Sequence, residues 1–241
     1  MKDKTYIGAD GLKYCSTHNL PIEKRYSCLE KPILCGCSEC KEITQNKKIC
    51  FSDAKMMIDW TFENDDRQRY PDIRKALVKY CEQFNDSSKS LLLYGDYGTG
   101  KSFFAACVVN ALIEKGYKVY FTDFVKFTNQ LQERFEGRQE NIDYLKKYDF
   151  IFLDDFGAER DTPAVQEMIS NIINGIYLSG IPIIITTNLS GADFEQPKSS
   201  KYARIYDRLF EMCIFFKMEG ISRRRSNFAE KQAEYKKSLG L

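Results

Sequence analysis

The sequence predicts an α/β fold in which a five-stranded parallel sheet lies between helices and is preceded by a small metal-binding module. Apolar segments alternate with amphipathic segments from residue 72 onward, which is typical of β–α–β units with right-handed crossovers. Two of the apolar segments, 150–153 and 181–185, contain no polar residue, as expected of strands that helices cover on both faces. The cysteine-rich stretch before residue 50 is too short to hold a core without a staple.

The expected elements follow in order along the chain. The strands are expected at 90–94, 118–122, 149–154, 181–186 and 213–217. The helices are expected at 72–84, 101–115, 123–135, 162–179 and 202–210, with a basic helix over 223–238. Apolar residues at helical spacing, such as Ile73, Leu77 and Phe84, carry the helix predictions. We therefore divide the chain into a module over 1–50, a connector over 51–71 and a main domain over 72–241.

Net charge and the lengths of the apolar runs exclude some classes of protein. The 241 residues carry a formal net charge of only +2, so any contact with nucleic acid must come from a local patch. The chain has no apolar run of about 18 residues, the least that a membrane-spanning helix needs. Its first residues also lack the apolar stretch of a signal peptide. We expect a cytoplasmic protein with no membrane partner.

A glycine-rich loop follows the first expected strand and reads Gly-Asp-Tyr-Gly-Thr-Gly-Lys-Ser over residues 95–102. It matches the phosphate-binding loop G-x-x-x-x-G-K-[ST] and lies where that loop occurs, between a strand and a helix. The glycines let backbone N–H groups point at one centre, and the following helix adds its N-terminal dipole. Lys101 would reach the β- and γ-phosphates of ATP, and the Ser102 hydroxyl would ligate Mg²⁺. The residues expected to contact the nucleotide here are Gly95, Gly98, Thr99, Gly100, Lys101, Ser102 and Phe103.

Polar residues end two of the expected strands. Asp154 and Asp155 follow an apolar run in the Walker B arrangement, in which Asp154 would hold Mg²⁺ and Asp155 would orient or deprotonate the attacking water. Glu159 is a second candidate for the carboxylate that acts on this water. Asn188 ends the next strand and could bond the γ-phosphate or the water, the role called sensor 1. A turn residue that ends a strand is the simpler interpretation of Asn188.

Six of the nine cysteines lie within the first 50 residues, which in a reducing compartment indicates metal ligation rather than disulfides. Cys15 and His18 form one chelating pair, and Cys37 and Cys40 form another. Three thiolates and one imidazole suit a closed tetrahedral Zn²⁺ site that staples the module. Cys35 is an alternative ligand to Cys37. A zinc ribbon that contacts DNA directly is the competing interpretation of this module.

The order of these motifs, with two arginine stretches further on, resembles the AAA+ ATPases of the DnaC/DnaI helicase-loader group. The stretches are Arg204-Ile-Tyr-Asp-Arg208-Leu and Ser222-Arg223-Arg224-Arg225, and the resemblance covers roughly residues 60–230. The resemblance implies that Arg208 is an arginine finger for ATP in a neighbouring subunit and that Arg223 contacts nucleotide in its own subunit (sensor 2). Without the resemblance, Arg204 and Arg208 would be interpreted as a solvated helix face.

By this resemblance the chain is expected to be an ATPase that forms homo-oligomers and loads the replicative DnaB-type helicase onto single-stranded DNA. We expect it to do so in a phage or mobile-element system. The zinc module would dock on the helicase. The IstB-type transposition ATPases share much of the pattern, so regulation of transposition is the alternative; an ATP-gated adaptor with vestigial hydrolysis is a third. Many AAA+ proteins have Asp-Glu at Walker B, and Asp154-Asp155 leaves open whether Asp155 or Glu159 positions the water.

The candidate segment for single-stranded DNA is 120–129, where Lys126 lies among aromatic residues that could stack on bases. Phe124, Phe127 and Leu131 in and after this segment fall at helical spacing. An ordinary stripe of core-facing side chains explains that spacing better than a stacking platform does.

Overall fold

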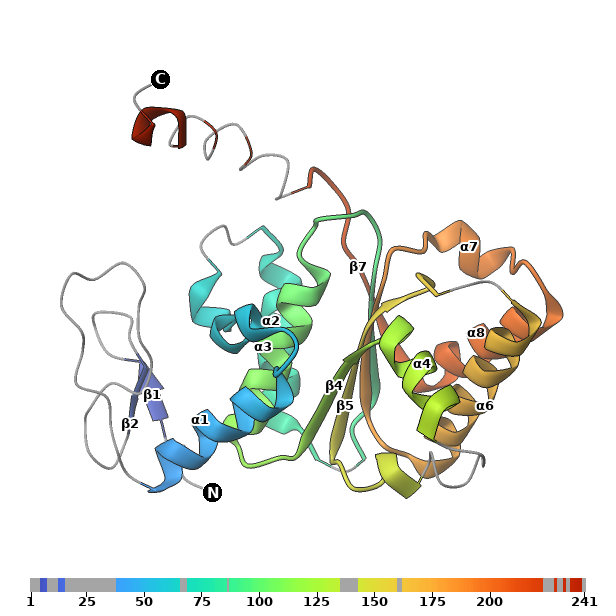
Figure 1. Cartoon of the computed structure of the whole chain (residues 1–241), viewed down its shortest axis with the longest axis horizontal. Coiled ribbons are helices and arrows are strands. Elements are labelled where there is room, and N and C mark those ends of the chain that lie inside the picture. The colour runs from blue at the N-terminus through green and yellow to red at the C-terminus, as the bar shows by residue number, and fades with distance from the viewer. Residues whose placement is uncertain are drawn as a thin grey trace.

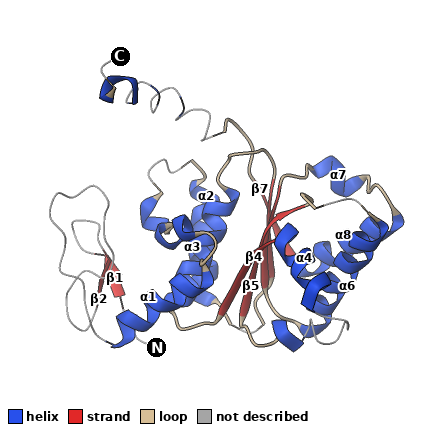
Figure 2. Ribbon diagram, in the orientation of Figure 1, coloured by secondary structure: helices blue, strands red, loops and turns tan. Residues whose placement is uncertain are grey.

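The computed structural model describes residues 5–7, 13–15, 38–65, 69–85, 87–134, 143–159, 162–222, 228, 232 and 235–239. A five-stranded parallel sheet runs through the middle of the molecule with helices on both of its faces (Figures 1 and 2). In spatial order the strands are β4 (Val119–Asp123), β5 (Phe150–Phe156), β6 (Ile183–Thr187), β3 (Ser90–Tyr94) and β7 (Cys213–Lys217). This confirms the predicted fold class, and each expected strand is present.

The sheet lies between two layers of helices because its strands carry apolar side chains on both faces. Leu91 and Leu93 of β3 point into one core, while Leu92 between them points into the other, and all three are buried. Because the strands are parallel, their carboxyl ends lie along one edge of the sheet. The phosphate loop after β3 and the carboxylates at the end of β5 therefore meet at this edge, with β6 between the two strands.

The main helices lie in two groups, one on each face of the sheet (Figure 1). Helices α2 (Pro71–Gln83) and α3 (Lys101–Glu114) cover one face, and α4 (Phe124–Arg134), α6 (Pro163–Ser179) and α8 (Ser200–Met212) cover the other. All five were expected close to these bounds. The sequence analysis missed the short helix α7 (Gly191–Glu195), although Ser190 and Asp193 form a capping box at its start. The expected basic helix over 223–238 lies mostly outside the described residues.

A further helix, α1 (Ser38–Cys50), packs against α3, and no helix was expected there. The Lys47 ammonium lies 2.8 Å from the Glu114 carboxylate at the end of α3, and both side chains are buried. Phe51, directly after α1, is fully buried and packs on Phe121 of β4, with ring centroids 5.3 Å apart. The short 3₁₀ helices η1 (Lys55–Asp59) and η2 (Phe62–Asn64) follow, and each buries an apolar side chain in the same core. The segment that we expected to be a connector therefore packs into the core of the domain.

The first part of the chain forms an antiparallel pair of short strands, β1 (Thr5–Ile7) and β2 (Lys13–Cys15). Of the four expected zinc ligands, Cys15 ends β2 and Cys40 lies in the first turn of α1, while His18 and Cys37 lie outside the described residues. Within the described ranges, no three His, Cys, Asp or Glu side chains are grouped so as to hold a metal ion. The zinc site therefore stays a prediction. Among all the residues that the structure describes, no helix has the length and apolar character to cross a membrane.

Candidate functional site

The phosphate loop takes a backbone path that only glycine adopts readily. Gly95, Gly98 and Gly100 have φ angles of 122°, 74° and 107°, in the left-handed region where a side chain is strained. A Cβ on Gly95 would also lie 2.5 Å from the carbonyl oxygen of Met218. The three glycines thus allow the turn that leads from β3 into α3, whose first turn points its free N–H groups at the loop.

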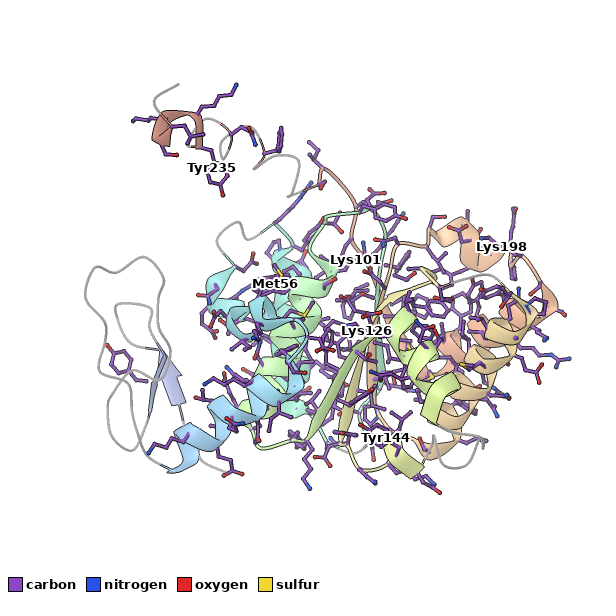
Figure 3. All side chains as sticks on the ribbon, in the orientation of Figure 1. Met56, Lys101, Lys126, Tyr144, Lys198 and Tyr235 are labelled. Atoms are coloured by element: carbon purple, nitrogen blue, oxygen red, sulfur yellow. The ribbon has the colours of Figure 1, made fainter. Side chains whose placement is uncertain are left out.

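Lys101, labelled in Figure 3, is the first residue of α3 and lies directly after this loop. Its Nζ donates to the carbonyl oxygens of Gly95 and Asp96, over 2.8 and 2.6 Å, and the side chain is only 5% exposed. Thr99 Oγ1 donates to the same Asp96 carbonyl oxygen over 2.9 Å. The loop thereby holds a buried positive charge beside its own backbone at the start of α3, which suits it to bind the phosphates of a nucleotide.

The carboxylate of Asp154 receives hydrogen bonds from two neighbouring elements. Ser102 Oγ of α3 donates to its Oδ1 over 2.8 Å, and Thr186 Oγ1 of β6 donates to the same oxygen. Burial raises the pKa of Asp154, and the charge of Asp155 adds to the rise, while the hydrogen bonds from Thr186 and Ser102 oppose it. A buried carboxylate beside two hydroxyl oxygens suits Mg²⁺, which binds oxygen ligands and would offset the cost of burying the charge. Ser102 and Asp154 are thus brought together as the sequence predicts.

Asp155 faces a different environment from its neighbour. Its side chain is exposed, its φ of 56° is left-handed, and its backbone N–H donates to Thr186 Oγ1 over 3.0 Å. Asn188 Nδ2 donates to the Asp155 carboxylate over 3.4 Å. The predicted pair Asp155 and Asn188 therefore lies together at the carboxyl edge of the sheet, next to the buried Asp154.

The sequence analysis gave no role to Thr186, whose one hydroxyl contacts both acidic residues. The signal was present, since Thr186 and Thr187 end a strand whose other residues are all isoleucine. Glu159, by contrast, is engaged within its own turn, where its Oε2 accepts a hydrogen bond from the Gly157 N–H over 2.8 Å. The two candidates for positioning water thus differ in surroundings, because Asp155 lies beside Asn188 and Glu159 bonds the backbone of the turn that follows β5.

The segment after β7, residues 218–222, lies across the phosphate loop, and we call it the strap. The Met218 N–H donates to the Tyr94 carbonyl oxygen over 2.8 Å, and the Gly220 N–H donates to Asp96 Oδ2 over 3.1 Å. A Cβ built on Gly98 would overlap the Ser222 side chain. Arg223 comes directly after the strap but lies outside the described residues.

Two residues in front of α2 hold the strap from its other side. Arg69 donates to the Ile221 carbonyl oxygen, and Tyr70 Oη donates to the Glu219 carbonyl oxygen over 2.7 Å. Tyr70 also packs against Phe104 of α3, with ring centroids 6.3 Å apart. The sequence offered no signal for these contacts, because the residues are about 150 positions apart in the chain.

Arg208 lies on α8, on the face of the sheet opposite α3 (Figure 1). Its guanidinium carbon lies 4.5 Å from the centroid of the Tyr177 ring, and its Nη1 donates to Glu211 over 3.3 Å. Arg204, one turn earlier, is exposed. The structure thus does not bring Arg208 to the phosphate loop of its own chain.

Lys126, the candidate DNA contact, is labelled in Figure 3. It forms ion pairs with Asp53 at 3.2 Å and Asp123 at 3.9 Å. Phe124 and Phe127 on either side of it are buried in the core. The core-facing interpretation of these two aromatic residues is therefore confirmed.

Together, the strand order, the loop after β3, the carboxylates near the end of β5 and the asparagine after β6 define a P-loop ATP-binding protein with the AAA+ fold. The chain belongs to the IstB-like ATP binding protein family, whose model matches residues 43–231.

The proteins similar to this chain include helicase loaders and insertion-sequence ATP-binding proteins. The replicative helicase loader DnaI of Bacillus subtilis is 28% identical over 164 residues, which are 61% of this chain and 52% of that protein. An insertion sequence ATP-binding protein of Sinorhizobium fredii is 32% identical over 145 residues, which are 58% of this chain and 48% of that protein. The chain thus spans about half the length of these relatives.

Solved structures agree on the fold. The crystal structure of DnaI superimposes with a TM-score of 0.58 at 20% identity and covers 70% of this chain and 93% of that one. The crystal structure of the DnaC helicase loader gives a TM-score of 0.58 at 23% identity and covers 69% of this chain and all of that one.

Proposed function

We propose that this chain hydrolyses ATP to load a replicative DnaB-type helicase onto single-stranded DNA, as part of a phage or mobile element. The observation that carries the ATPase part is the hydrogen bond between Ser102 and Asp154, because it joins the phosphate loop to a buried carboxylate at a site suited to Mg²⁺. The names of the relatives, several of which are helicase loaders, support the loading part.

In the proposed reaction, the phosphate loop and Lys101 bind the β- and γ-phosphates. Ser102 and Asp154 would hold Mg²⁺, which neutralises charge on these phosphates when it is bound. Asp155 orients the attacking water, and Asn188 orients Asp155 or bonds the γ-phosphate. The position of Asp155 at the open edge of the sheet, 3.4 Å from Asn188, favours it over Glu159 for this role.

The choice between the two acids can be tested by comparing D155N and E159Q. We expect D155N to lower kcat for ATP hydrolysis by about 10²-fold or more while the affinity for ATP stays within about twofold. E159Q keeps an acceptor for the Gly157 N–H, so its kcat should stay near that of the wild type. The reverse result would assign the water to Glu159, and loss of ATP binding in both variants would argue against either role.

Arg208 is proposed to complete the site of a neighbouring subunit. It lies across the sheet from α3, so an arginine at this place serves an active site only if a second copy of the chain supplies the nucleotide. Arg223 is proposed to contact the nucleotide in its own subunit, and the strap before it supports this because Ser222 touches Gly98 of the phosphate loop.

The N-terminal cysteines are proposed to bind structural Zn²⁺ through Cys15, His18, Cys37 and Cys40, with Cys35 as the alternative to Cys37, and the stapled module is proposed to dock on the helicase. The test is co-purification with a DnaB-type helicase, with and without ATP. The full chain is compared with a chain that lacks residues 1–37, because α1 begins at Ser38 and packs on the ATPase domain. A complex that depends on residues 1–37 supports the loader.

The second candidate is an ATPase that regulates DNA transposition, which the similarity to the Sinorhizobium protein favours. It predicts no complex with the helicase in any nucleotide state. A transposase encoded beside this chain would then be the partner to test by the same co-purification.

A further inference from the structure

Arg208 is held in a closed triangle of three side chains from two helices. Its guanidinium lies over the ring of Tyr177 on α6, and its Nη1 donates to Glu211 Oε2 on its own helix. Tyr177 Oη closes the triangle by donating to the other oxygen of the same carboxylate, Glu211 Oε1. Each side chain thus contacts the other two, and we call Arg208, Tyr177 and Glu211 the arginine triangle.

The two contacts use different parts of the guanidinium group. An aromatic ring takes the flat face of a guanidinium, whereas a carboxylate or a phosphate takes the N–H groups at its edge. Tyr177 can therefore remain stacked on Arg208 while the partner at the edge changes. Glu211 cannot, because it uses the same edge that a phosphate group would need.

The triangle is accessible from outside the chain. The side chains of Arg208 and Glu211 are 43% and 56% exposed, so an incoming anion can reach the guanidinium. An exposed ion pair of this kind is weak, and a triphosphate carries more negative charge than one carboxylate. Exchange of Glu211 for a phosphate is therefore favourable once a neighbouring chain presents its nucleotide.

We propose that Tyr177 and Glu211 are positioning residues for the arginine finger: the Tyr177 ring orients the guanidinium of Arg208, and the Glu211 carboxylate occupies its edge until the triphosphate of a neighbouring subunit displaces it. This inference rests on the proposed role of Arg208. It adds that Arg208 stays bound to Glu211 in the unassembled chain. ATP hydrolysis then begins only when two subunits are close enough for the triphosphate of one to replace Glu211 of the other.

The chain offers a matched control at the same pair of helices. Lys201 of α8 lies 3.6 Å from Glu167 of α6, and these side chains are 42% and 69% exposed. The pair joins the two helices as the triangle does and is similarly exposed, but it includes neither the finger nor a stacked ring. A purely structural role for the triangle would make E167Q and E211Q behave alike.

The experiment measures Mg²⁺-dependent ATP hydrolysis as a function of protein concentration for the full chain. We expect E211Q to reach half of its maximal rate at about threefold lower protein concentration, with the maximal rate unchanged, because the competing charge is gone. Y177A should lower the maximal rate about tenfold at saturating protein concentration, since the finger loses its platform, and Y177F should restore it because the ring remains. E167Q should match the wild type in both quantities, and the thermal midpoints of all variants are measured to confirm folding.

R208A separates the failure of this inference from the failure of the proposed function. If R208A abolishes the concentration-dependent hydrolysis and E211Q behaves as the wild type does, the triangle plays no part and the inference is overturned. If R208A itself hydrolyses ATP like the wild type, Arg208 is not an arginine finger, and its proposed role in the site of a neighbouring subunit is wrong. Loss of rate in Y177F equal to that in Y177A would overturn the role of the ring.

Discussion

Ser102 Oγ and Asp154 Oδ1 lie 2.8 Å apart, although 52 positions separate the two residues in the chain. Ser102 lies at the start of α3, just after the loop that follows β3, and in the sheet β6 lies between β3 and the β5 strand that carries Asp154. Thr186 of that intervening strand donates to the same carboxylate oxygen and so bridges the gap. The candidate magnesium site therefore depends on three separate segments whose positions only the sheet fixes.

Replacing Lys101 should impair nucleotide binding far more than folding. Hydrogen bonds from a charged donor are each worth about 1.5–3 kcal/mol, so we expect K101A to weaken ATP binding by about 10- to 100-fold in a titration with a fluorescent ATP analogue. Lys115 at the other end of α3 is a matched control, because its Nζ also donates to two backbone carbonyl oxygens, those of Cys81 and Glu82. ATP affinity in K115A should equal that of the wild type, and an equal loss in both variants would contradict the assignment.

Asp154 should make the stability of the metal-free protein depend on pH. Burial raises the pKa of Asp154, so the folded chain binds its proton more tightly than the unfolded chain does. The free energy of unfolding should therefore fall as the pH rises from the ordinary aspartate pKa, about 3.9, through the raised value in the folded state. D154N should lack this fall and should be more stable than the wild type above that range.

Urea unfolding of wild type and D154N across this pH range measures the difference. Mg²⁺ should restore the stability of the wild type at neutral pH and leave D154N unchanged. Parallel pH profiles for the two proteins would show that Asp154 ionises as easily in the folded state as in the unfolded chain.

Gly98 and Gly116 allow the cost of the strap contact to be separated from the cost of a left-handed backbone. Both have positive φ, 74° and 91°, but a Cβ on Gly98 would overlap Ser222, whereas one on Gly116 would meet nothing within 4 Å. G116A should lose only about 1–2 kcal/mol of unfolding free energy. G98A should lose more and should also bind ATP less tightly.

The double variant G98A/S222G tests the cause of that difference. Removing the Ser222 side chain should bring the stability of the G98A background back to the level of G116A in urea unfolding. If the second substitution recovers nothing, the extra cost comes from the loop alone and the contact with the strap is unimportant.

Breaking the buried ion pair of Lys47 and Glu114 should lower the free energy of unfolding strongly, whereas replacing both residues with apolar ones should lower it little. K47M removes one charge of this buried pair and keeps the Glu114 carboxylate buried, and we expect a loss of about 3–5 kcal/mol in the free energy of unfolding. K47M/E114L replaces both charges with apolar groups and should recover most of it. Lys217 and Glu219 form an exposed pair, so K217M should hardly change the urea midpoint. A double variant as unstable as K47M would show that α1 needs the charges themselves.

The same ion pair explains why α1 was missed while the other main helices were predicted. Ile43, Lys47 and Phe51 follow one another at intervals of four, and all three are buried. A lysine in the middle of this stripe removes the apolar periodicity, and only the tertiary contact with Glu114 makes the position a core position. The strands were predictable because their apolar character does not depend on any partner.

In the candidate site, too, some residues could be predicted from the sequence and others could not. The phosphate loop and the pair Asp154 and Asp155 could be read from the sequence because each is a contiguous motif in a recognisable context. The contact of Arg208 with Tyr177 could not, since Tyr177 lies on α6 and the sequence does not state how α6 packs on α8, whereas Glu211 lies only three residues after Arg208 in the same helix. The contacts of the strap with Arg69 and Tyr70 have the same origin.

The end of β5 has one further consequence. Between Leu153 and Phe156 this strand advances three residues while β6 advances two, and the extra residue leaves Asp154 buried and Asp155 exposed. Apolar exchanges within β5 leave that arrangement intact. A single inserted or deleted residue in the strand would shift its register and exchange the surroundings of the two carboxylates. We therefore expect natural variants of this chain to differ in the composition of β5 but not in its length.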